Sequence, residues 1–362
     1  MKLKLHSRPS SISIPISPNP CSKSPKTISR FPLNTQILHF SLPQSKHLKP
    51  ISSINKDQSD CSNRLQFIRH KKLLSDLSTW GIGGICNYFI QVTTISQLIS
   101  AVRYCNDNSV RFLIVGKGSN CLFDDQGFDG CVILNRIEFI QKIEPGLYRV
   151  GSGYPFNRLG VQSCNEGFSG LEFAGGIPGT VGGATYMNAG ANGQETADII
   201  DSVEFVSNDG RYRTLNRNDL TFSYRRSSFQ DMDDLAAIIT VTFCLTPSAT
   251  AKSQQQTYLA RRRLTQPVGE RSAGSVFQNP LGFSAGELIE KVGLKGHRVG
   301  GAKISDIHAN FFINIGNSTS KDMLKLINLA KEKVNSKFGI QLNEEVRYIN
   351  SCNSKNSNTL LH

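Results

Sequence analysis

The sequence predicts a folded chain of mixed helices and strands with more than one domain, preceded by a basic tail. Its 362 residues suffice for about two and a half domains of roughly 150 residues each. Hydrophobic residues make up 38% and charged residues 19%, which argues against disorder over the whole length. The longest apolar stretch, 235–245, is far below the roughly 20 residues of a membrane-spanning helix, so we expect no membrane span.

The tail accounts for the basic character of the chain. Residues 1–56 contain nine Lys or Arg, twelve Ser and eight Pro, and no Asp, Glu or Gly. The net charge of +13 falls to +4 when these nine cations are subtracted. A basic, Ser-rich and acid-free segment is typical of an organellar transit peptide, and its prolines forbid a long amphipathic helix of the mitochondrial kind. We therefore expect residues 1–60 to be a disordered transit peptide directing the protein to the plastid (chloroplast) stroma.

Two alternatives to a plastid presequence remain. One is targeting to the mitochondrial matrix. The other is a disordered tail that binds nucleic acid or a membrane loosely. With only +4 on the remaining chain, we expect no nucleic-acid partner for the folded part.

The first elements alternate between helix and strand. Residues 94–106 have apolar side chains at helical spacing, and Thr94 with Gln97 predicts a capping box. The run 111–115 predicts a buried strand that ends in a tight glycine loop at 116–120. Further strands are expected at 131–134, 147–150, 202–206 and 237–243, with a hairpin turn at 208–210.

The middle of the chain is rich in glycine. Residues 146–193 contain thirteen glycines in 48 residues, which indicates backbone at positive φ or in close approach to another group. In the segment 175–183, backbone N–H groups could form an anion-binding nest, and tight packing of turns is an equally good explanation.

The C-terminal third begins with a polar stretch, 247–256, that predicts a linker. A helix over 284–292 is expected because Ser284 and Glu287 form a capping pattern, and a longer helix runs from Ser320 to just before Gly339. Residues 346–349 predict a closing strand, and 351–362 a disordered tail.

Metal chemistry is not expected. No two of the nine cysteines are closer than ten residues, and the chain has no HExxH motif. The cysteines are therefore interpreted as buried thiols.

Three positions could carry chemistry, although none is specific by itself. Arg225 lies beside Tyr224 between predicted strands, Ser275 lies in a Gly-flanked turn, and Glu345 precedes the last strand. An arginine fork binds carboxylate or phosphate, but an exposed ion pair is the usual role of such a residue.

Taken in order, these segments resemble the MurB family, the flavoprotein UDP-N-acetylenolpyruvoylglucosamine reductases of peptidoglycan synthesis. The resemblance runs from about Trp80 to Ile349. It depends most on LEFAGGIPGTVGGATYMNAGA at 171–191, and also on the motifs at 116–120, 224–229, 273–277, 308–311 and 345–347. The short interval 226–257 resembles the subclass with the shorter substrate-closing loop.

The resemblance implies an α+β, vanillyl-alcohol-oxidase (PCMH-type) FAD-binding fold of two lobes, with a C-terminal α+β substrate-binding domain. The FAD-binding part is expected at 65–248, with lobes at about 65–135 and 136–248, and the substrate domain at 257–350. FAD would be bound non-covalently, NADPH would donate hydride, and the substrate would be a small UDP-sugar. We expect a monomer. The residues expected to bind FAD are Gly116, Lys117, Gly118, Ser119, Asn120, Gly175, Gly176, Ile177, Pro178, Gly179, Thr180, Gly182, Gly183, Asn188 and Gly190.

By the same resemblance, the catalytic residues are Arg225, Ser275 and Glu345. Arg225 would stabilise the developing anion, and Ser275 would protonate the carbanion. Glu345 would hold either the substrate carboxylate or Arg225. Tyr224 and Asn279 would bind substrate.

Two departures from the family pattern concern substrate affinity. Bacterial members commonly carry proline where this chain has Arg271, and a lysine is frequent at Gln278. The alternative functions are a flavin-dependent sugar or alcohol oxidase on the same fold, and a non-catalytic flavin-binding relative.

Overall fold

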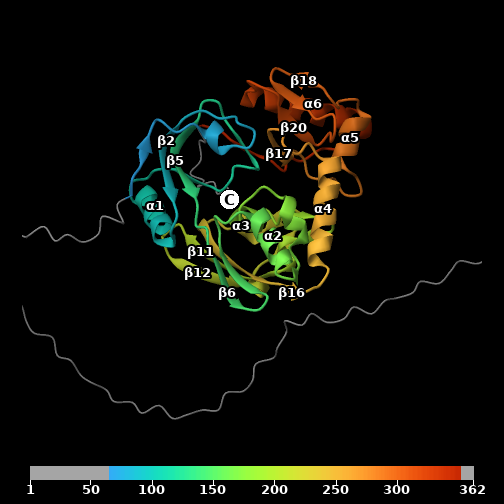
Figure 1. Cartoon of the computed structure of the whole chain (residues 1–362). Coiled ribbons are helices and arrows are strands. Elements are labelled where there is room, and N and C mark those ends of the chain that lie inside the picture. The colour runs from blue at the N-terminus through green and yellow to red at the C-terminus, as the bar shows by residue number, and fades with distance from the viewer. Residues whose placement is uncertain (1–64, 352–362) are drawn as a thin grey trace, which may run out of the picture. The chain divides into compact units, whose positions relative to one another are not determined.

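The computed structural model describes residues 65–351 (Figure 1). The expected transit peptide at 1–60, and the expected tail beyond Ser351, lie outside the described residues.

The first lobe is built on a four-stranded sheet in the order β1-β2-β5-β3. Its strands are β1 Ile68–Arg69, β2 Cys86–Val92, β5 Phe128–Asn135 and β3 Phe112–Val115. Strands β2 and β3 both run parallel to β5, and every residue of β3 is buried. A parallel strand that is covered on both faces requires a continuous apolar run. The sequence of 111–115 has such a run, and it therefore predicts a buried strand.

Helix α1, Ile95–Asp107, follows β2. The hydroxyl of Thr94 accepts a hydrogen bond from the backbone N–H of Gln97, which confirms the predicted N-cap. The side chain of Gln97 accepts from the backbone N–H of Thr93 rather than of Thr94, so the reciprocal half of the capping box is shifted by one residue.

The second lobe is an antiparallel sheet in the order β12-β11-β15-β7-β6. Its strands are β12 Tyr212–Asn216, β11 Ile200–Ser207, β15 Leu235–Cys244, β7 Leu147–Gly151 and β6 Ile140–Glu144. The predicted hairpin at 208–210 joins β11 to β12. Both sheets share one hydrophobic core with α1, α2 Phe156–Asn165 and α3 Val181–Tyr186.

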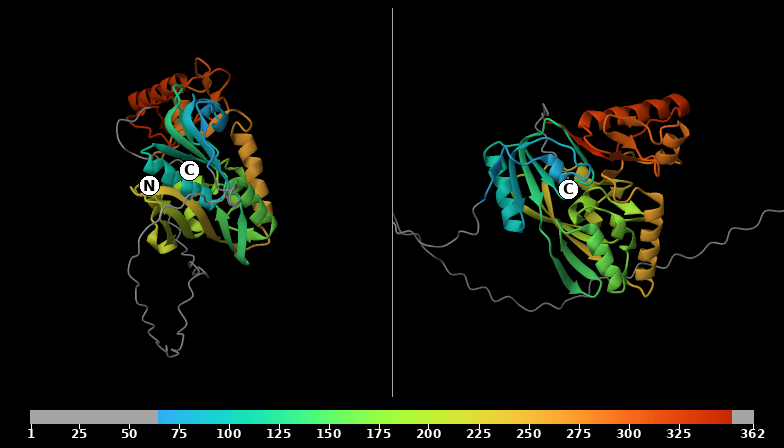
Figure 2. Two further views of the ribbon diagram at one scale, coloured as in Figure 1. Left: turned by 90° about the vertical axis from the view of Figure 1, so that its left-hand side faces the viewer. Right: turned by 45° about the horizontal axis from the view of Figure 1, so that its top comes forward.

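The C-terminal segment, orange and red in Figure 2, contains a third sheet. Its strand order is β17-β20-β19-β18. Its strands are β17 Ser272–Ser275, β20 Phe311–Asn314, β19 Ala302–Ile304 and β18 Arg298–Val299. The predicted helices are α5 Ala285–Lys291, capped by Ser284, and α6 Ser320–Phe338. Helix α6 ends at Gly339, whose φ is +69°, and its predicted apolar face is buried.

The segment 247–256, predicted as a linker, is helical from Ala251 onward. Helix α4 begins at Ala251 and ends at Thr265, and it connects the second lobe to the C-terminal segment (Figure 1). Only Ala251 and Gln255 of α4 are buried, so the helix has no apolar stripe from which periodicity could be recognised. Its Ala, Gln, Lys, Leu and Arg residues nevertheless have high intrinsic helix propensity.

The remaining elements are short. Strands β4 Cys121–Phe123 and β21 Arg347–Ile349 pair in parallel. Three further pairs are antiparallel: β8 Phe168–Ser169 with β16 Thr246–Pro247, β9 Gly190–Ala191 with β10 Gln194–Glu195, and β13 Phe222–Ser223 with β14 Arg226–Ser227. Residues 65–351 also contain the 3-10 turns η1 Leu74–Leu77, η2 Glu172–Gly176, η3 Thr196–Asp198, η4 Arg217–Asp219 and η5 Ser228–Gln230.

Most of the described cysteines are buried, as the sequence predicted. Five of the six cysteines within residues 65–351 are buried thiols and Cys244 is half-buried. In the same part of the chain, no helix combines the length and apolarity needed to cross a membrane.

The single tryptophan links the N-terminal part of the first lobe to the C-terminal core. Trp80 is fully buried together with C-terminal apolar residues, and its indole N–H donates to the carbonyl of Phe312 at 2.7 Å. In return, the side-chain amide of Asn314 donates to the carbonyl of Trp80 at 2.8 Å. The core of the C-terminal segment is therefore completed by Trp80, which lies 232 positions before Phe312.

Replacing Trp80 with Phe keeps an aromatic ring but leaves the buried Phe312 carbonyl without its donor. We expect the free energy of unfolding to fall by about 2 kcal/mol, because an unpaired buried polar group costs about 1–3 kcal/mol. Urea unfolding followed by circular dichroism measures this. Leu281→Ala, at a fully exposed position, is the control, and an unchanged midpoint for Trp80→Phe would contradict the role.

Candidate functional site

A cavity of about 280 Å³ lies where the glycine loops meet the C-terminal segment. Its wall contains thirteen of the residues predicted for the site: Lys117, Gly118, Ser119, Asn120, Ile177, Pro178, Gly179, Thr180, Gly183, Gly190, Arg225, Ser275 and Glu345. Tyr224, Asn188, Asn279, Gly116, Gly175, Gly176 and Gly182 do not line it. The fold thus brings the three predicted catalytic residues from three distant segments to one cavity.

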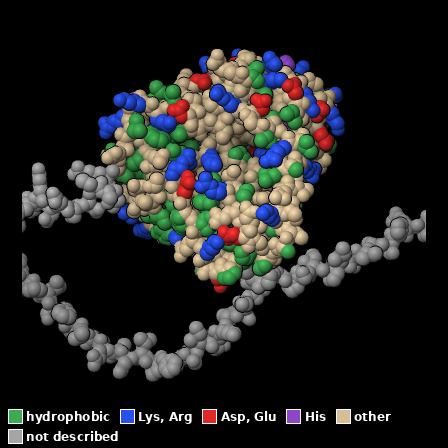
Figure 3. Space-filling model, in the orientation of Figure 1, with side chains coloured by type: hydrophobic (Ala, Val, Ile, Leu, Met, Phe, Trp, Pro, Cys, Tyr) green, Lys and Arg blue, Asp and Glu red, His purple; other side chains and the backbone are tan. Residues whose placement is uncertain are grey.

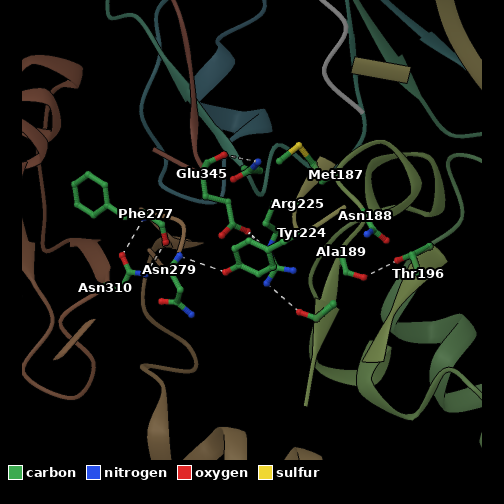
Figure 4. A network of polar contacts seen from close by, with 12 residues as sticks. Met187, Asn188, Ala189, Thr196, Tyr224, Arg225, Phe277, Asn279, Asn310 and Glu345 are labelled. Carbon is green, nitrogen blue, oxygen red and sulfur yellow. Dashed lines mark hydrogen bonds and ion pairs between the residues drawn. The ribbon is translucent and has the colours of Figure 1, made fainter. Parts of the chain in front are cut away.

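Arg225 lies at the tip of the hairpin between β13 and β14 (Figure 4). Its φ of +58° is in the left-handed region, which costs a non-glycine residue roughly 1–2 kcal/mol. Two amide side chains hold this turn: Gln230 donates to the carbonyl of Arg225 at 3.1 Å, and Asn188 donates to the carbonyl of Ser223 at 2.9 Å.

Arg225 and Glu345 form an ion pair. The Nε of Arg225 donates to the Glu345 carboxylate at 2.8 Å and its Nη2 donates to the carbonyl of Gly190 at 3.0 Å. The two side chains are only 18% and 17% exposed. Burial raises the pKa of Glu345, and the adjacent Arg225 opposes this rise. The carboxylate therefore depends on its arginine partner to remain ionised.

The backbone around Glu345 is fixed by both sides of the cavity. Its N–H donates to the carbonyl of Val276 at 2.8 Å, and its carbonyl accepts from the side chain of Asn120 at 3.1 Å. Glu345 thus connects the glycine loop at 116–120 to the strand that carries Ser275.

Ser275 is the last residue of strand β17, where a turn had been expected. The strand is irregular there: its register against β20 shifts between Ser272 and Ser275, and Gly274 has a φ of +75°. The preceding glycine therefore permits the conformation, but the serine belongs to the sheet.

Asn310 fixes the chain that follows Ser275, and sequence reasoning missed it. Its side chain accepts from the N–H of Phe277 at 2.9 Å and donates to the carbonyl of Phe277 at 2.8 Å. The only signal was its position within the motif at 308–311.

The two glycine loops are in contact, and neither Gly116 nor Gly118 has room for a side chain. A Cβ at Gly116 would lie 2.4 Å from the hydroxyl oxygen of Thr180, and one at Gly118 would lie 1.9 Å from the carbonyl oxygen of Leu77. Gly118 also has a φ of +57°. Close packing therefore explains these glycines directly.

The loop at 116–120 fits the diphosphate of FAD. None of the hydrogen bonds formed within residues 65–351 uses the backbone N–H of Lys117, Gly118 or Ser119 as donor. Burial lowers the pKa of Lys117, and Arg136 lowers it further. Backbone N–H groups that form no hydrogen bond, and that lie near more cations than anions, can bind an anion. On the face shown in Figure 3, Lys and Arg side chains gather near the middle.

Three predicted binding residues have other contacts. Asn188 is buried and also donates to Glu195 at 2.8 Å, so its bonds support the Arg225 hairpin. The hydroxyl of Tyr224 accepts from the backbone N–H of Asn279 at 3.3 Å, and Arg225 lies 4.9 Å from the centre of the Tyr224 ring. These contacts join the hairpin to the C-terminal segment (Figure 4).

Sequence reasoning also missed two polar residues of the cavity wall, Arg262 and Gln266. Arg262 belongs to helix α4, and Gln266 follows it. If helix α4 had been predicted from the sequence, both residues would have been candidates for the site. Within the described part of the chain, no three His, Cys, Asp or Glu residues are grouped as metal ligands would be.

Two family models match the chain. The model of the UDP-N-acetylenolpyruvoylglucosamine reductase C-terminal domain matches residues 266–349, and an FAD binding domain model matches residues 86–216. These matches confirm the predicted fold class, an FAD-binding fold of two lobes with a C-terminal domain.

Curated relatives are similar in sequence to this chain over most of their own length. The UDP-N-acetylenolpyruvoylglucosamine reductase of Protochlamydia amoebophila is 46% identical over 304 residues, which are 84% of this chain and 97% of that protein. The same reductase of Chlamydia trachomatis serovar A is 45% identical over 276 residues, covering 76% and 94%. The crystal structure of MurB from Thermus caldophilus superposes with a TM-score of 0.66 at 33% identity, over 79% of this chain and 98% of that one.

The contact at Gly118 gives a test of the loop. Gly118→Ala would force a Cβ onto the carbonyl of Leu77 and strain the positive φ, so we expect the purified protein to lose bound flavin, seen as loss of its visible absorbance. Gly193→Ala is the matched control, because Gly193 has a φ of +81° but no atom within 4 Å of the added Cβ. Equal flavin content in the two variants would contradict this packing role.

Proposed function

The chain belongs to the UDP-N-acetylenolpyruvoylglucosamine reductase family, and we propose that it reduces that enolpyruvyl UDP-sugar to UDP-N-acetylmuramate in peptidoglycan precursor synthesis. FAD is the cofactor and NADPH the hydride donor. The observation that carries this function is the convergence of Arg225, Ser275 and Glu345 on one cavity beside the FAD-binding loop.

FAD, when bound, supplies hydride to the enolpyruvyl double bond. Negative charge then develops on the carbon next to the substrate carboxylate, so the chain must supply a cation and a proton there. Arg225 meets the first need. Its Nε and Nη2 are held by Glu345 and Gly190, and within residues 65–351 no hydrogen bond uses its Nη1, which remains for the substrate carboxylate.

Ser275 meets the second need. A hydroxyl is a weak acid, but an enolised carboxylate is a strong base, so transfer from the Ser275 hydroxyl is favourable. Of the two roles considered for Glu345, its 2.8 Å bond to Arg225 supports holding the arginine. The raised pKa of Glu345 also suits a group that can share a proton.

Three finer proposals complete this function. We propose the shorter-loop subclass, because β14 and α4 are separated by η5, β15 and β16 alone. We propose a monomer with a small-molecule UDP-sugar as its partner. We also propose that residues 1–60 are a plastid transit peptide, supported by their basic, acid-free composition.

Ser275→Ala should separate the two half-reactions. We expect NADPH to reduce the flavin at nearly the normal rate, and reoxidation by the UDP-enolpyruvyl sugar to slow about 10²–10⁴-fold, because one positioned proton donor contributes that much. Anaerobic stopped-flow absorbance measures both. Ser272→Ala, on the same strand but outside the cavity, is the control.

An equal loss in both half-reactions would refute the role of Ser275. In the unmodified protein, rapid reoxidation by oxygen with none by the UDP-sugar would favour a flavin oxidase. Reduction without any reoxidation by the UDP-sugar would reject this substrate.

The transit peptide can be tested by itself. A fluorescent protein fused behind residues 1–60 should accumulate in plastids of plant cells, whereas a fusion with its Lys and Arg replaced by Gln should remain outside them. Accumulation of the first fusion in mitochondria would support the alternative destination.

A further inference from the structure

A second cavity, of about 220 Å³, adjoins the first and lies between η2 and helix α4. The two cavities share Ala191, Arg262 and Gln266. Tyr224 and Asn279, which the resemblance assigns to substrate, line neither of them. The second cavity is therefore a branch that leaves the reacting centre in its own direction.

Arg262 lines the branch together with Arg261 and Glu172, and it forms no ion pair with the Glu172 carboxylate. Its guanidinium takes part in no ion pair or hydrogen bond formed within residues 65–351, and burial lowers its pKa with no acidic neighbour to oppose this. Its stem crosses Gly176, where a Cβ would lie 2.6 Å from the Arg262 Cδ. Partial burial of a cation that forms no ion pair costs folding free energy, and a bound anionic ligand would offset this cost.

The same cavity offers acceptors that have no donor. The Oε1 atoms of Glu172 and Gln266 are buried and have no hydrogen-bond partner among the described residues. The other carboxylate oxygen of Glu172 accepts from the N–H of Gly170 at 2.8 Å. Such acceptors suit hydroxyl or amino groups, so the cavity fits a ligand that combines these groups with an anion. A phosphorylated ribose is such a ligand.

We propose that Arg262 binds the 2′-phosphate of NADPH and thereby selects NADPH over NADH. This inference rests on the proposed function, which requires a nicotinamide dinucleotide at the same reacting centre. The two dinucleotides differ by this one phosphate, and an arginine fork is the usual partner of a phosphate dianion. Glu172 and Gln266 accept from the hydroxyl and amino groups of the adenosine.

Binding of NADP⁺ and NAD⁺ to the oxidised, FAD-loaded protein tests the assignment by calorimetry. We expect Arg262→Gln to weaken NADP⁺ about 10–100-fold, as expected for loss of a charge-assisted hydrogen bond, and to leave NAD⁺ unchanged. Arg262→Lys, which keeps the charge, should lose less. The matched control is Arg263→Gln, since Arg263 is exposed on the same helix and lines neither cavity.

Equal weakening of NADP⁺ and NAD⁺, or no change in either, would overturn the proposal. So would a loss confined to the UDP-sugar, which would assign Arg262 to the substrate diphosphate. If Arg262→Gln fails to retain FAD, the unmodified protein gives the answer. Adenosine 2′-monophosphate should then compete with NADP⁺ better than adenosine 5′-monophosphate does, and equal competition would overturn the proposal.

These outcomes can be told apart from failure of the proposed function. Reoxidation of the reduced, unmodified protein by the UDP-enolpyruvyl sugar tests that function without involving the preference between dinucleotides.

Discussion

The ion pair between Arg225 and Glu345 is the interaction on which the arrangement of the site depends. It joins residues 120 positions apart, one at a hairpin tip of the second lobe and one just before the last strand. Because both side chains are largely buried, removal of either partner would leave an uncompensated charge, which is strongly destabilising. The left-handed backbone of Arg225 persists because this pair, together with the bonds from Gln230 and Asn188, determines its geometry.

The glycines serve packing first and ligand binding second. Gly116 and Gly118 let the first loop lie directly against Thr180 and the carbonyl of Leu77. That contact holds the loop with three backbone N–H groups available to a ligand and with a cation, Lys117, whose pKa burial has lowered. Rigid support of free donors is what makes the loop suitable for a diphosphate, since the donors need no rearrangement on binding.

The sequence predicted those elements whose signals are local. Thr94 and Ser284 cap helices as expected, Gly339 ends α6, and the apolar run at 111–115 is a buried strand. Helix α4 was missed because it buries few residues, and intrinsic propensity is a weaker signal than periodicity. Arg262 was missed for the same reason. Ser275 was identified, but its place in a strand was not, because pairing with Phe311 is long-range information.

By itself, the sequence determined the residue types, their order and the local elements, and through motif resemblance it determined the family. Those properties depend on side-chain chemistry and on short-range backbone preference, and neighbouring residues in the sequence are enough to determine both. Only the tertiary structure decided that Glu345 holds Arg225 and that Asn188 supports the hairpin rather than lining the cavity. It also decided that Arg262 faces a second branch and forms no ion pair there with any described residue. Each of these depends on which distant segments pack together, and no periodicity or spacing in one segment specifies its neighbour.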